Sequence, residues 1–267
     1  MQRITAGATA YYQFDQWIAT RSLIHGVFTR LGGFSASPWA SLNVGSMVGD
    51  DPQAVERNAT HMYNTLGLDR ERACTVWQVH GIETVIARER PADRRWLAKA
   101  DALVTDQIGL PLSMRFADCV PVLLYDPVHH AIGMAHAGWR GTVGGVVRSA
   151  LDAMCATFGT QPADVQASIG PSIGPADYQV GEEVVQAVRN TFGSTDSAAD
   201  PLIRRADDGS AYFDLWAANR LTLERSGVQH IEISAISTAT HTDEFYSHRA
   251  EHGQTGRFGA VIALETR

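Results

Sequence analysis

The sequence predicts an α/β (α+β) fold, a layered sandwich with a mixed sheet that forms one domain over residues 1–267. Strand-like and helix-like segments alternate along the chain, with no internal repeat and no Pro/Ser-rich linker. Two apolar runs, residues 120–125 and 131–135, are separated only by the turn-like stretch DPVHH and predict an antiparallel hairpin. This hairpin and the absence of a G-x-G-x-x-G or P-loop motif oppose a doubly wound nucleotide-binding fold.

Six short apolar runs predict the strands of this fold. In chain order they cover residues 75–79, 120–125, 131–135, 165–169, 231–237 and 258–264. Four longer segments have apolar residues at helical spacing and predict helices. In chain order they cover residues 51–66, 143–158, 182–192 and 214–226. We expect Thr142 and Asp214 to cap the second and fourth helices, and residues 193–211 to form a surface excursion.

The hairpin is expected to bring two reactive side chains together. A fold-back centred between Pro127 and Val128 places Cys119 opposite His136 on the neighbouring strand. Facing residues of an antiparallel pair have Cβ atoms roughly 4.5–5.5 Å apart, close enough to share a proton or a metal ion. His80 follows another predicted strand, and two imidazoles with one thiolate suit Zn²⁺ and leave a fourth coordination position open. The alternative is that Cys119 is a small buried apolar residue.

The segment AHAGWRGT, residues 135–142, has the features of an anion-binding turn. Gly138 and Gly141 permit a close approach of the backbone, and Arg140 lies just ahead of the expected helix start. Free N–H groups at a helix start and a guanidinium together bind phosphate well. The alternative is that Arg140 pairs with a surface carboxylate while Trp139 covers the core.

A second histidine motif, H-x-x-E-H at residues 248–252, has the spacing of one metalloprotease class. That class needs a continuous helix, so that both histidines share one face. Gly253 and Gly256 follow the motif and the preceding THTDEFYS is a poor helix former, so we do not expect a protease site.

Composition restricts the partners and the compartment. The formal net charge of −7 opposes general binding to nucleic acid or to an acidic membrane. No apolar run reaches the roughly 18 residues that span a bilayer, and the first residues lack the apolar core of a secretory signal. Three cysteines do not form a disulfide framework in a chain of this size. We therefore expect a soluble, cytoplasmic protein that binds small molecules, with no prediction of its oligomeric state.

Ten short motifs occur in an order that is found in one known family. They are FTRLGG (28–33), SLNVG (41–45), QVHG (78–81), ADA (100–102), ADCVPVLLYDP (117–127), AHAGWRGT (135–142), IGPSIG (169–174), YQVG (178–181), FYSHR (245–249) and TGR (255–257). Over nearly its full length the chain resembles the peptidoglycan-editing-factor and polyphenol-oxidase (laccase-domain) family. The fifth and sixth motifs are the most specific part of the match.

The resemblance implies a single-domain fold related to Cys-His deamidases and a zinc site formed by His80, Cys119 and His136. It implies phosphorolysis of purine nucleosides (adenosine, inosine and methylthioadenosine), with inorganic phosphate as co-substrate and adenosine deamination as a second activity. It also connects the chain to copper-dependent polyphenol oxidation and to the editing of peptidoglycan precursors. Ser237-Thr238 stands where the family usually has Cys-Thr, so no thiol role is carried over to Ser237.

Further site residues are expected near these motifs. The expected phosphate-binding residues are Arg30, Arg140 and Arg249. Asn43 and Gln78 are expected to bind the nucleoside, because amides both donate and accept hydrogen bonds. Asp118 beside the cysteine would orient a ligand or move a proton, or it simply ends a strand. Zinc would activate water for deamination by lowering its pKa.

Three other functions remain alternatives. Cys119 activated by His136 would be the nucleophile of a hydrolase or amidase, which tightly bound zinc would oppose by occupying the thiolate. A multicopper oxidase needs many ligands, usually in His-x-His pairs, and the sequence contains no His-x-His, although copper could occupy the triad in vitro. A catalytically silent binding protein would be expected to lack one of His80, Cys119 and His136, and all three are present.

Overall fold

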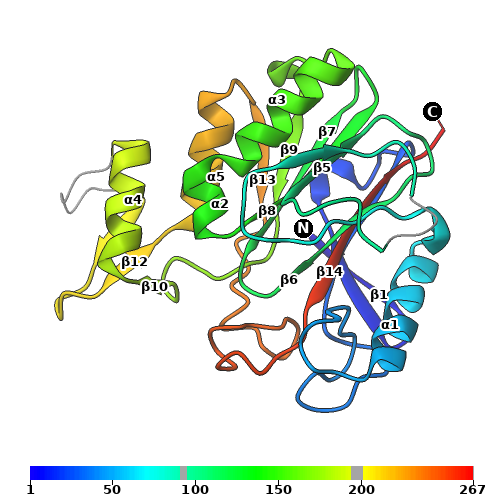
Figure 1. The fold of residues 1–267 in the computed structure, drawn as a ribbon, viewed down its shortest axis with the longest axis horizontal. Helices are drawn as coiled ribbons and strands as arrows, with labels where there is room; N and C mark the ends of the chain where they lie inside the picture. The colour runs from blue at the N-terminus through cyan, green and yellow to red at the C-terminus, as the bar shows by residue number, and fades with distance from the viewer. Residues whose placement is uncertain (91–94, 194–200, 267) are drawn as a thin grey trace.

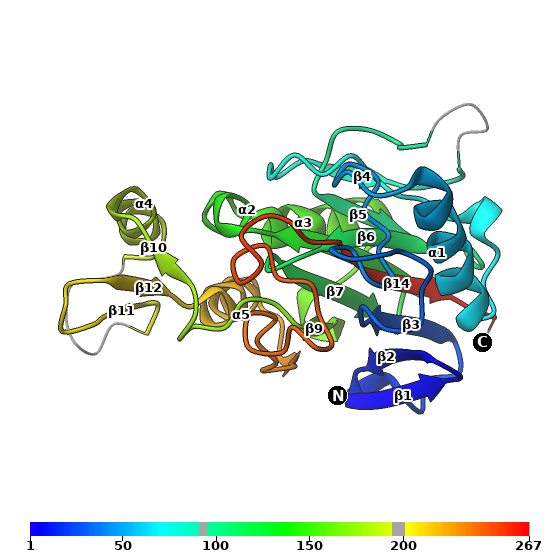
Figure 2. The same ribbon diagram turned by 90° about the horizontal axis from the view of Figure 1, so that it is seen from below.

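The computed structural model describes residues 1–90, 95–193 and 201–266. Two large sheets pack face to face, helices cover both outer faces, and a small third sheet lies at one end (Figure 1, Figure 2). This architecture confirms the predicted mixed α+β class. The prediction of one domain over the whole chain stays a prediction.

The elements are as follows. The six-stranded sheet has the order β13 (His230–Ile233), β9 (Gln166–Ile169), β7 (Val120–Asp126), β8 (Ala131–Ala137), β5 (Ala102–Thr105) and β4 (Thr84–Ile86). The five-stranded sheet has the order β1 (Gln2–Ala6), β2 (Thr9–Gln13), β3 (Leu23–Phe28), β14 (Phe258–Leu264) and β6 (Leu112–Phe116). The three-stranded sheet has the order β10 (Gln179–Val180), β12 (Ala211–Phe213) and β11 (Ile203–Arg205). The α-helices are α1 (Pro52–Thr65), α2 (Trp139–Gly144), α3 (Val146–Phe158), α4 (Glu182–Phe192) and α5 (Leu215–Arg225).

Alternating side chains along the central strands produce the layers. In β7, Val122 and Leu124 pack with the helical cluster that contains α3 and α5, whereas Leu123 and Tyr125 pack against the five-stranded sheet. The side chains of β14 likewise alternate between two clusters. One cluster lies between the two large sheets, and the other contains residues of α1. Every residue of β7, β8 and β14 is buried, which explains why these strands are nearly continuous apolar runs in the sequence.

Four of the six predicted strands are confirmed as β7, β8, β9 and β14. Residues 75–79 instead make one isolated bridge, from Trp77 to Lys99, and the Val76 carbonyl accepts a hydrogen bond from the Arg115 guanidinium at 2.6 Å. The partly buried Arg115 side chain thus donates to a main-chain carbonyl that would otherwise accept an N–H from a neighbouring strand. Strand β13 covers only the first part of residues 231–237, because Ala235 adopts a left-handed backbone with φ 53°.

The hairpin of β7 and β8 is confirmed, but its predicted centre between Pro127 and Val128 is wrong. Asp126 pairs with Ala131, so four residues form the turn and its centre lies one residue later. The cause is the Asp126 carboxylate, which accepts hydrogen bonds from the N–H groups of Val128 and His129 at 2.8 and 3.1 Å and stabilises the wider turn.

The corrected register changes the residue that faces His136. Its partner in the ladder is Pro121 rather than Cys119. A shift of two positions keeps a residue on the same face of a strand, so Cys119 still approaches His136, diagonally rather than directly.

The helices expected over residues 51–66, 182–192 and 214–226 are confirmed, with Asp214 accepting a hydrogen bond from a first-turn N–H of α5 at 2.9 Å. Residues 143–158 do not form one helix, because Gly145 adopts a left-handed backbone with φ 88° between α2 and α3. The expected Thr142 cap is wrong, since α2 begins at Trp139 and Thr142 lies inside it.

Part of the predicted surface excursion 193–211 is folded. Strands β11 and β12 pair there, and Ile203 packs into the same buried cluster as α4. Residues 194–200 lie outside the described residues. Among the helices that the structure describes, none combines the length and the apolar character needed to cross a membrane.

Candidate functional site

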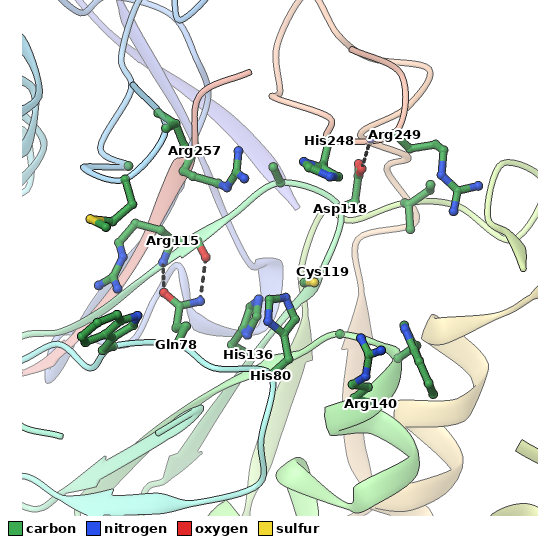
Figure 3. A pocket seen from close by; sticks show the side chains of 18 of the residues that line it. Gln78, His80, Arg115, Asp118, Cys119, His136, Arg140, His248, Arg249 and Arg257 are labelled. Atoms are coloured by element: carbon green, nitrogen blue, oxygen red, sulfur yellow. Dashed lines mark hydrogen bonds between the residues drawn. The ribbon is translucent and has the colours of Figure 1, made fainter. Parts of the chain in front are cut away.

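Three potential metal ligands meet at one end of the layer between the two large sheets. The ligand atoms of His80, Cys119 and His136 all lie within 4.8 Å of one another (Figure 3). His136 is the next-to-last residue of β8, Cys119 immediately precedes β7, and His80 lies in the loop before β4. The structure therefore brings together the three residues that the sequence singled out.

Asp101, just ahead of β5, is fully buried and holds two members of this triad in place. Its carboxylate accepts hydrogen bonds from the main-chain N–H groups of Val79, His80 and Gly81 at 3.0, 3.0 and 2.7 Å, and lies 2.7 Å from His136 Nδ1. Burial raises the pKa of Asp101, but the hydrogen bonds from His136 and Gly81 outweigh it and lower the pKa overall. An ionised carboxylate only accepts, so Nδ1 carries a proton and Nε2 is the nitrogen that would bind a metal, in exchange for its own proton.

Asp118 fixes the turn that carries Cys119. It adopts a left-handed backbone with φ 81°, and its two carboxylate oxygens accept hydrogen bonds from the Thr238 hydroxyl at 2.7 Å and the Arg249 main-chain N–H at 2.6 Å. These contacts support a positioning role, because they tie the cysteine turn to the loops that follow β13.

The triad favours the thiolate form of its sulfur. Burial raises the pKa of the Cys119 thiol, but the charge and hydrogen bonds of His136 and His80 outweigh burial and bring the pKa to about 6. Burial lowers the pKa of His136, whereas the Cys119 thiolate and the Asp101 carboxylate raise this pKa to about 9. By contrast, burial raises the pKa of the Cys74 thiol to about 11.

The donor set fits a divalent transition metal. Zinc and copper are both bound by imidazole and thiolate, and three protein ligands leave one position open. Asp101 provides the carboxylate that metal-binding histidines usually contact on their second nitrogen. A Cβ atom on Gly138 would lie 2.9 Å from Cys119 Sγ and 3.2 Å from His80 Cδ2. Glycine at 138 therefore leaves the ligands the space to approach one another.

The triad opens into a cavity of about 560 Å³, a size typical of small-molecule sites. Its basic side chains are Arg115, Arg140, His248, Arg249 and Arg257. Asp118 is the one acidic residue among the described lining residues, and both its oxygens already accept hydrogen bonds. In the described part of the chain, none of the four arginines forms an ion pair with a carboxylate. Uncompensated charge in a partly buried cavity is costly, so this lining suits an anionic ligand.

Three of the predicted binding residues line this cavity. Arg140 lies in the first turn of α2 rather than ahead of it, with its guanidinium 4.4 Å from the centre of the Trp139 ring. Arg249 donates one hydrogen bond to a main-chain carbonyl of β10 at 2.8 Å. The Gln78 amide donates to the Arg115 carbonyl at 2.8 Å and accepts from the Arg115 N–H at 3.0 Å. Gln78 therefore positions the backbone of Arg115.

Arg30 and Asn43, expected as phosphate and nucleoside ligands, lie outside the lining of the cavity that holds the other predicted binding residues. Arg30 pairs with Glu251 at 2.9 Å and its guanidinium lies 4.4 Å from the centre of the Tyr246 ring. Asn43 is fully buried and accepts the main-chain N–H of Arg257 at 2.8 Å. Both side chains contact the loop that precedes β14, Arg30 through Glu251 and Asn43 through the main chain of Arg257.

Two further predictions concern the C-terminal third of the chain. Ser237 donates to Asp177 at 2.6 Å and accepts the Gly174 N–H at 3.0 Å, outside the cavity lining. Residues 248–252 form turns rather than a helix, as expected, and Glu251 accepts a nearby main-chain N–H at 3.0 Å in addition to its ion pair. The H-x-x-E-H spacing therefore does not form a protease site.

Four residues of the site were not proposed from the sequence. They are Asp101, Arg115, Tyr178 and Arg257. Asp101, Tyr178 and Arg257 belong to the ADA, YQVG and TGR motifs, which are signals that could have found them. Arg115 lies between apolar residues of a strand and gives no such signal. Burial raises the pKa of Tyr178 to about 12, so its hydroxyl stays protonated at neutral pH.

Comparison with known proteins agrees with this geometry. Residues 24–265 match the family described as multi-copper polyphenol oxidoreductase laccase. A Deinococcus radiodurans protein named purine nucleoside phosphorylase is 38% identical over 243 residues, which cover 91% of this chain and 90% of that protein. A Geobacillus stearothermophilus protein named purine nucleoside phosphorylase YlmD is 38% identical over 248 residues, which cover 90% of this chain and 89% of that protein.

Solved structures show the same fold. The crystal structure of YlmD from Geobacillus stearothermophilus is 34% identical, has a TM-score of 0.89 and covers 98% of both chains. The crystal structure of the Bacillus licheniformis hypothetical protein YfiH is 32% identical, has a TM-score of 0.88 and covers 97% of both chains. With the sequence match spanning nearly the whole chain, this protein belongs to the multi-copper polyphenol oxidoreductase laccase family.

Proposed function

We propose that this protein is a metal-dependent purine nucleoside phosphorylase that uses inorganic phosphate and adenosine, inosine or methylthioadenosine. The observation that carries the proposal is a metal-ligand triad in one cavity with four arginines that have no carboxylate partner among the described residues. The names of two relatives at 38% identity support purine nucleoside phosphorolysis as the activity, and the three nucleosides come from the family resemblance.

We assign to the residues of this lining the groups that phosphorolysis needs. A phosphate oxygen forms a bond to C1′ of the ribose while the bond from C1′ to the base nitrogen breaks, and the products are the free base and ribose 1-phosphate. Arg140 and Arg249 lie on the same side of the triad (Figure 3), and we assign phosphate binding to them. Phosphate held there places negative charge beside the positive charge that develops at C1′. The protonated Tyr178 hydroxyl, in the same lining, donates a hydrogen bond to a ligand oxygen or nitrogen.

We propose zinc as the metal held by His80, Cys119 and His136, because this nitrogen and sulfur set is one that zinc prefers. When bound, zinc supplies a Lewis acid and lowers the pKa of a coordinated water. Adenosine deamination is a second proposed activity, supported by the open position of a three-ligand set. Copper would use the same donors, but the described residues contain no other cluster of potential ligands from which a multicopper site would be built.

The alternative that Cys119 acts as a nucleophile is supported by one observation. The pKa of Cys119 is lowered to about 6 and that of His136 is raised to about 9, which gives a thiolate beside an imidazolium as in Cys-His hydrolases. Metal content separates the two functions, because a zinc-bound thiolate is not free to attack a substrate.

The biological role and the cellular location of the protein are also proposals. The link to the editing of peptidoglycan precursors depends on the family resemblance, and a cytoplasmic location is expected from the sequence. Two measurements on a deletion strain would separate these roles. Altered sensitivity to cell-wall-active antibiotics would support a cell-wall role, whereas altered nucleoside pools alone would support a purely nucleoside role.

The proposed activity is tested with metal analysis and a ribose 1-phosphate assay on purified protein supplied with inosine and phosphate. We expect one zinc ion per chain, and we expect Cys119→Ala to lose the metal and at least 100-fold of the activity. Cys155→Ala is the matched control, because Cys155 is a free cysteine on α3 outside the cavity lining. Phosphorolysis that persists in Cys119→Ala, or its absence in the zinc-loaded wild type, would overturn the proposal.

A further inference from the structure

The cavity contains more cationic side chains than one phosphate ion and an uncharged nucleoside require. Figure 3 shows Arg140 and Arg249 on one side of the triad and Arg115 and Arg257 on the other. Both pairs lack carboxylate partners in the described chain. If the first pair binds inorganic phosphate, the second pair is left without an anion.

Neither Arg115 nor Arg257 forms an ion pair with a carboxylate in the described chain. Arg115, on β6, donates hydrogen bonds to the Thr75 hydroxyl and to the Val76 carbonyl, which are uncharged acceptors. Burial lowers the pKa of Arg115 to about 10, which reflects the cost of keeping this charge away from water. Arg257 donates to two main-chain carbonyls of its own loop at 3.2 and 2.7 Å. A negative group bound in the cavity that both residues line would offset this cost.

A second, smaller cavity of about 90 Å³ adjoins the first at Arg115. Ser46, Trp96 and Arg115 line both cavities. The other basic residues of the second lining are Arg70, Arg90 and Arg95. Arg70 and Arg90 pair with glutamates, whereas Arg95 lies over the Trp96 ring at 5.2 Å and has no ion pair in the described chain. Positive charge therefore continues from the main cavity through Arg115 to the surface.

We propose that Arg115 and Arg257, with Arg95 at the outer end, form a second anion subsite that binds a phosphate group carried by the nucleoside substrate. The inference depends on the proposed function and names its substrate class as purine nucleoside 5′-phosphates. With inosine 5′-monophosphate, the bond from C1′ to the base nitrogen breaks and a bond from C1′ to a phosphate oxygen forms. The base takes up the proton that this oxygen loses, and the products are hypoxanthine and ribose 1,5-bisphosphate.

The test compares the binding of inosine and inosine 5′-monophosphate to zinc-loaded protein by calorimetry, without inorganic phosphate. We expect the wild type to bind the monophosphate at least tenfold more tightly. Arg257→Gln should remove most of this preference, whatever its effect on inosine itself. Arg95→Ala should reduce the preference two- to fivefold, with inosine affinity changed less than twofold. Arg95 is exposed, so its variant tests the subsite without risk to the fold. Arg220→Ala is the control, because Arg220 is exposed on α5 and lies outside both linings.

The possible results test the second subsite and the proposed function separately. Equal affinity of the wild type for both ligands, or a preference unchanged in both variants, would overturn the second subsite. A raised KM for inorganic phosphate with an unchanged preference would assign these arginines to the co-substrate and also overturn it. Ribose 1-phosphate formation from inosine, measured on the same samples, is independent of these results. If no ribose 1-phosphate forms but the protein still prefers the monophosphate, the proposed function is overturned and the anion subsite remains supported.

Discussion

Replacement of Asp101 by asparagine breaks the connection between the fold and the triad. The carboxylate accepts four hydrogen bonds, from three main-chain N–H groups and from His136 Nδ1. With the amide oxygen still accepting from Val79 and Gly81, the NH₂ takes the position that faces His80 and His136, so the His80 main-chain N–H loses its acceptor. One unsatisfied buried donor costs about 1–3 kcal/mol, so the free energy of unfolding should fall by about that amount.

The same substitution acts on the metal site. An amide NH₂ that faces His136 makes Nδ1 an acceptor, so the proton moves to Nε2 and removes the lone pair that would bind a metal. Loss of such a carboxylate partner costs about 10–100-fold in metal affinity, which equals about 1.4–2.7 kcal/mol. We expect Asp101→Asn to weaken zinc binding by this factor.

Chelator competition measures the zinc affinity, and urea unfolding measures the stability. Asp126→Asn is the matched control: Asp126 is also fully buried and contacts His129 at 2.9 Å, but it lies at the opposite end of β7 from the triad. It should lower the stability and leave the zinc affinity unchanged. Zinc affinity within twofold of wild type in Asp101→Asn, or an equal loss in the control, would refute the reasoning.

Three other substitutions or titrations test separate parts of the structure. Gly138→Ala places a methyl carbon 2.9 Å from Cys119 Sγ, so zinc affinity should fall at least tenfold with thermal unfolding unchanged; an unaltered affinity would show that the ligands do not need this space. In metal-free protein, alkylation of Cys119 by iodoacetamide should have a pH midpoint near 6 and zinc should protect the thiol; a midpoint near 9 would contradict the lowered pKa. Burial lowers the pKa of His25 from 6.5 to about 4, and its Nε2 accepts the Phe14 N–H at 2.8 Å. The unfolded chain therefore binds this proton first, and the free energy of unfolding should fall by about 3 kcal/mol as the pH drops from 6.5 to 4. Urea titrations across this range should show a smaller decrease in His25→Gln, and an identical decrease would assign the effect to other groups.

The elements that depend on local periodicity could be predicted from the sequence, whereas the hairpin register could not. The register depends on how the Asp126 side chain captures two N–H groups, a choice among turns that the stretch DPVHH leaves open. The proximity of Cys119 and His136 survived this error because a shift of two positions preserves the face of the strand. Gly145 split the predicted helix because a glycine within an apolar periodic run does not reveal its φ angle.

The three residues of the triad could be predicted as a group because their motifs are local, whereas the surroundings of each arginine could not. Arg30 finds its carboxylate partner 221 residues further along the chain, at Glu251. Arg115, between apolar strand residues, finds no carboxylate partner in the described chain and lines the cavity. Ion pairs between distant segments are set by the tertiary fold, so no local pattern distinguishes a structural arginine from a ligand-binding one.

The most direct measurement follows radiolabelled inorganic phosphate in a reaction of zinc-loaded protein with inosine. We predict that the label enters ribose 1-phosphate in an amount equal to the hypoxanthine released, and that Cys119→Ala forms neither product. Hypoxanthine released without labelled sugar phosphate would show hydrolysis in place of phosphorolysis and would contradict the proposed function of this cavity.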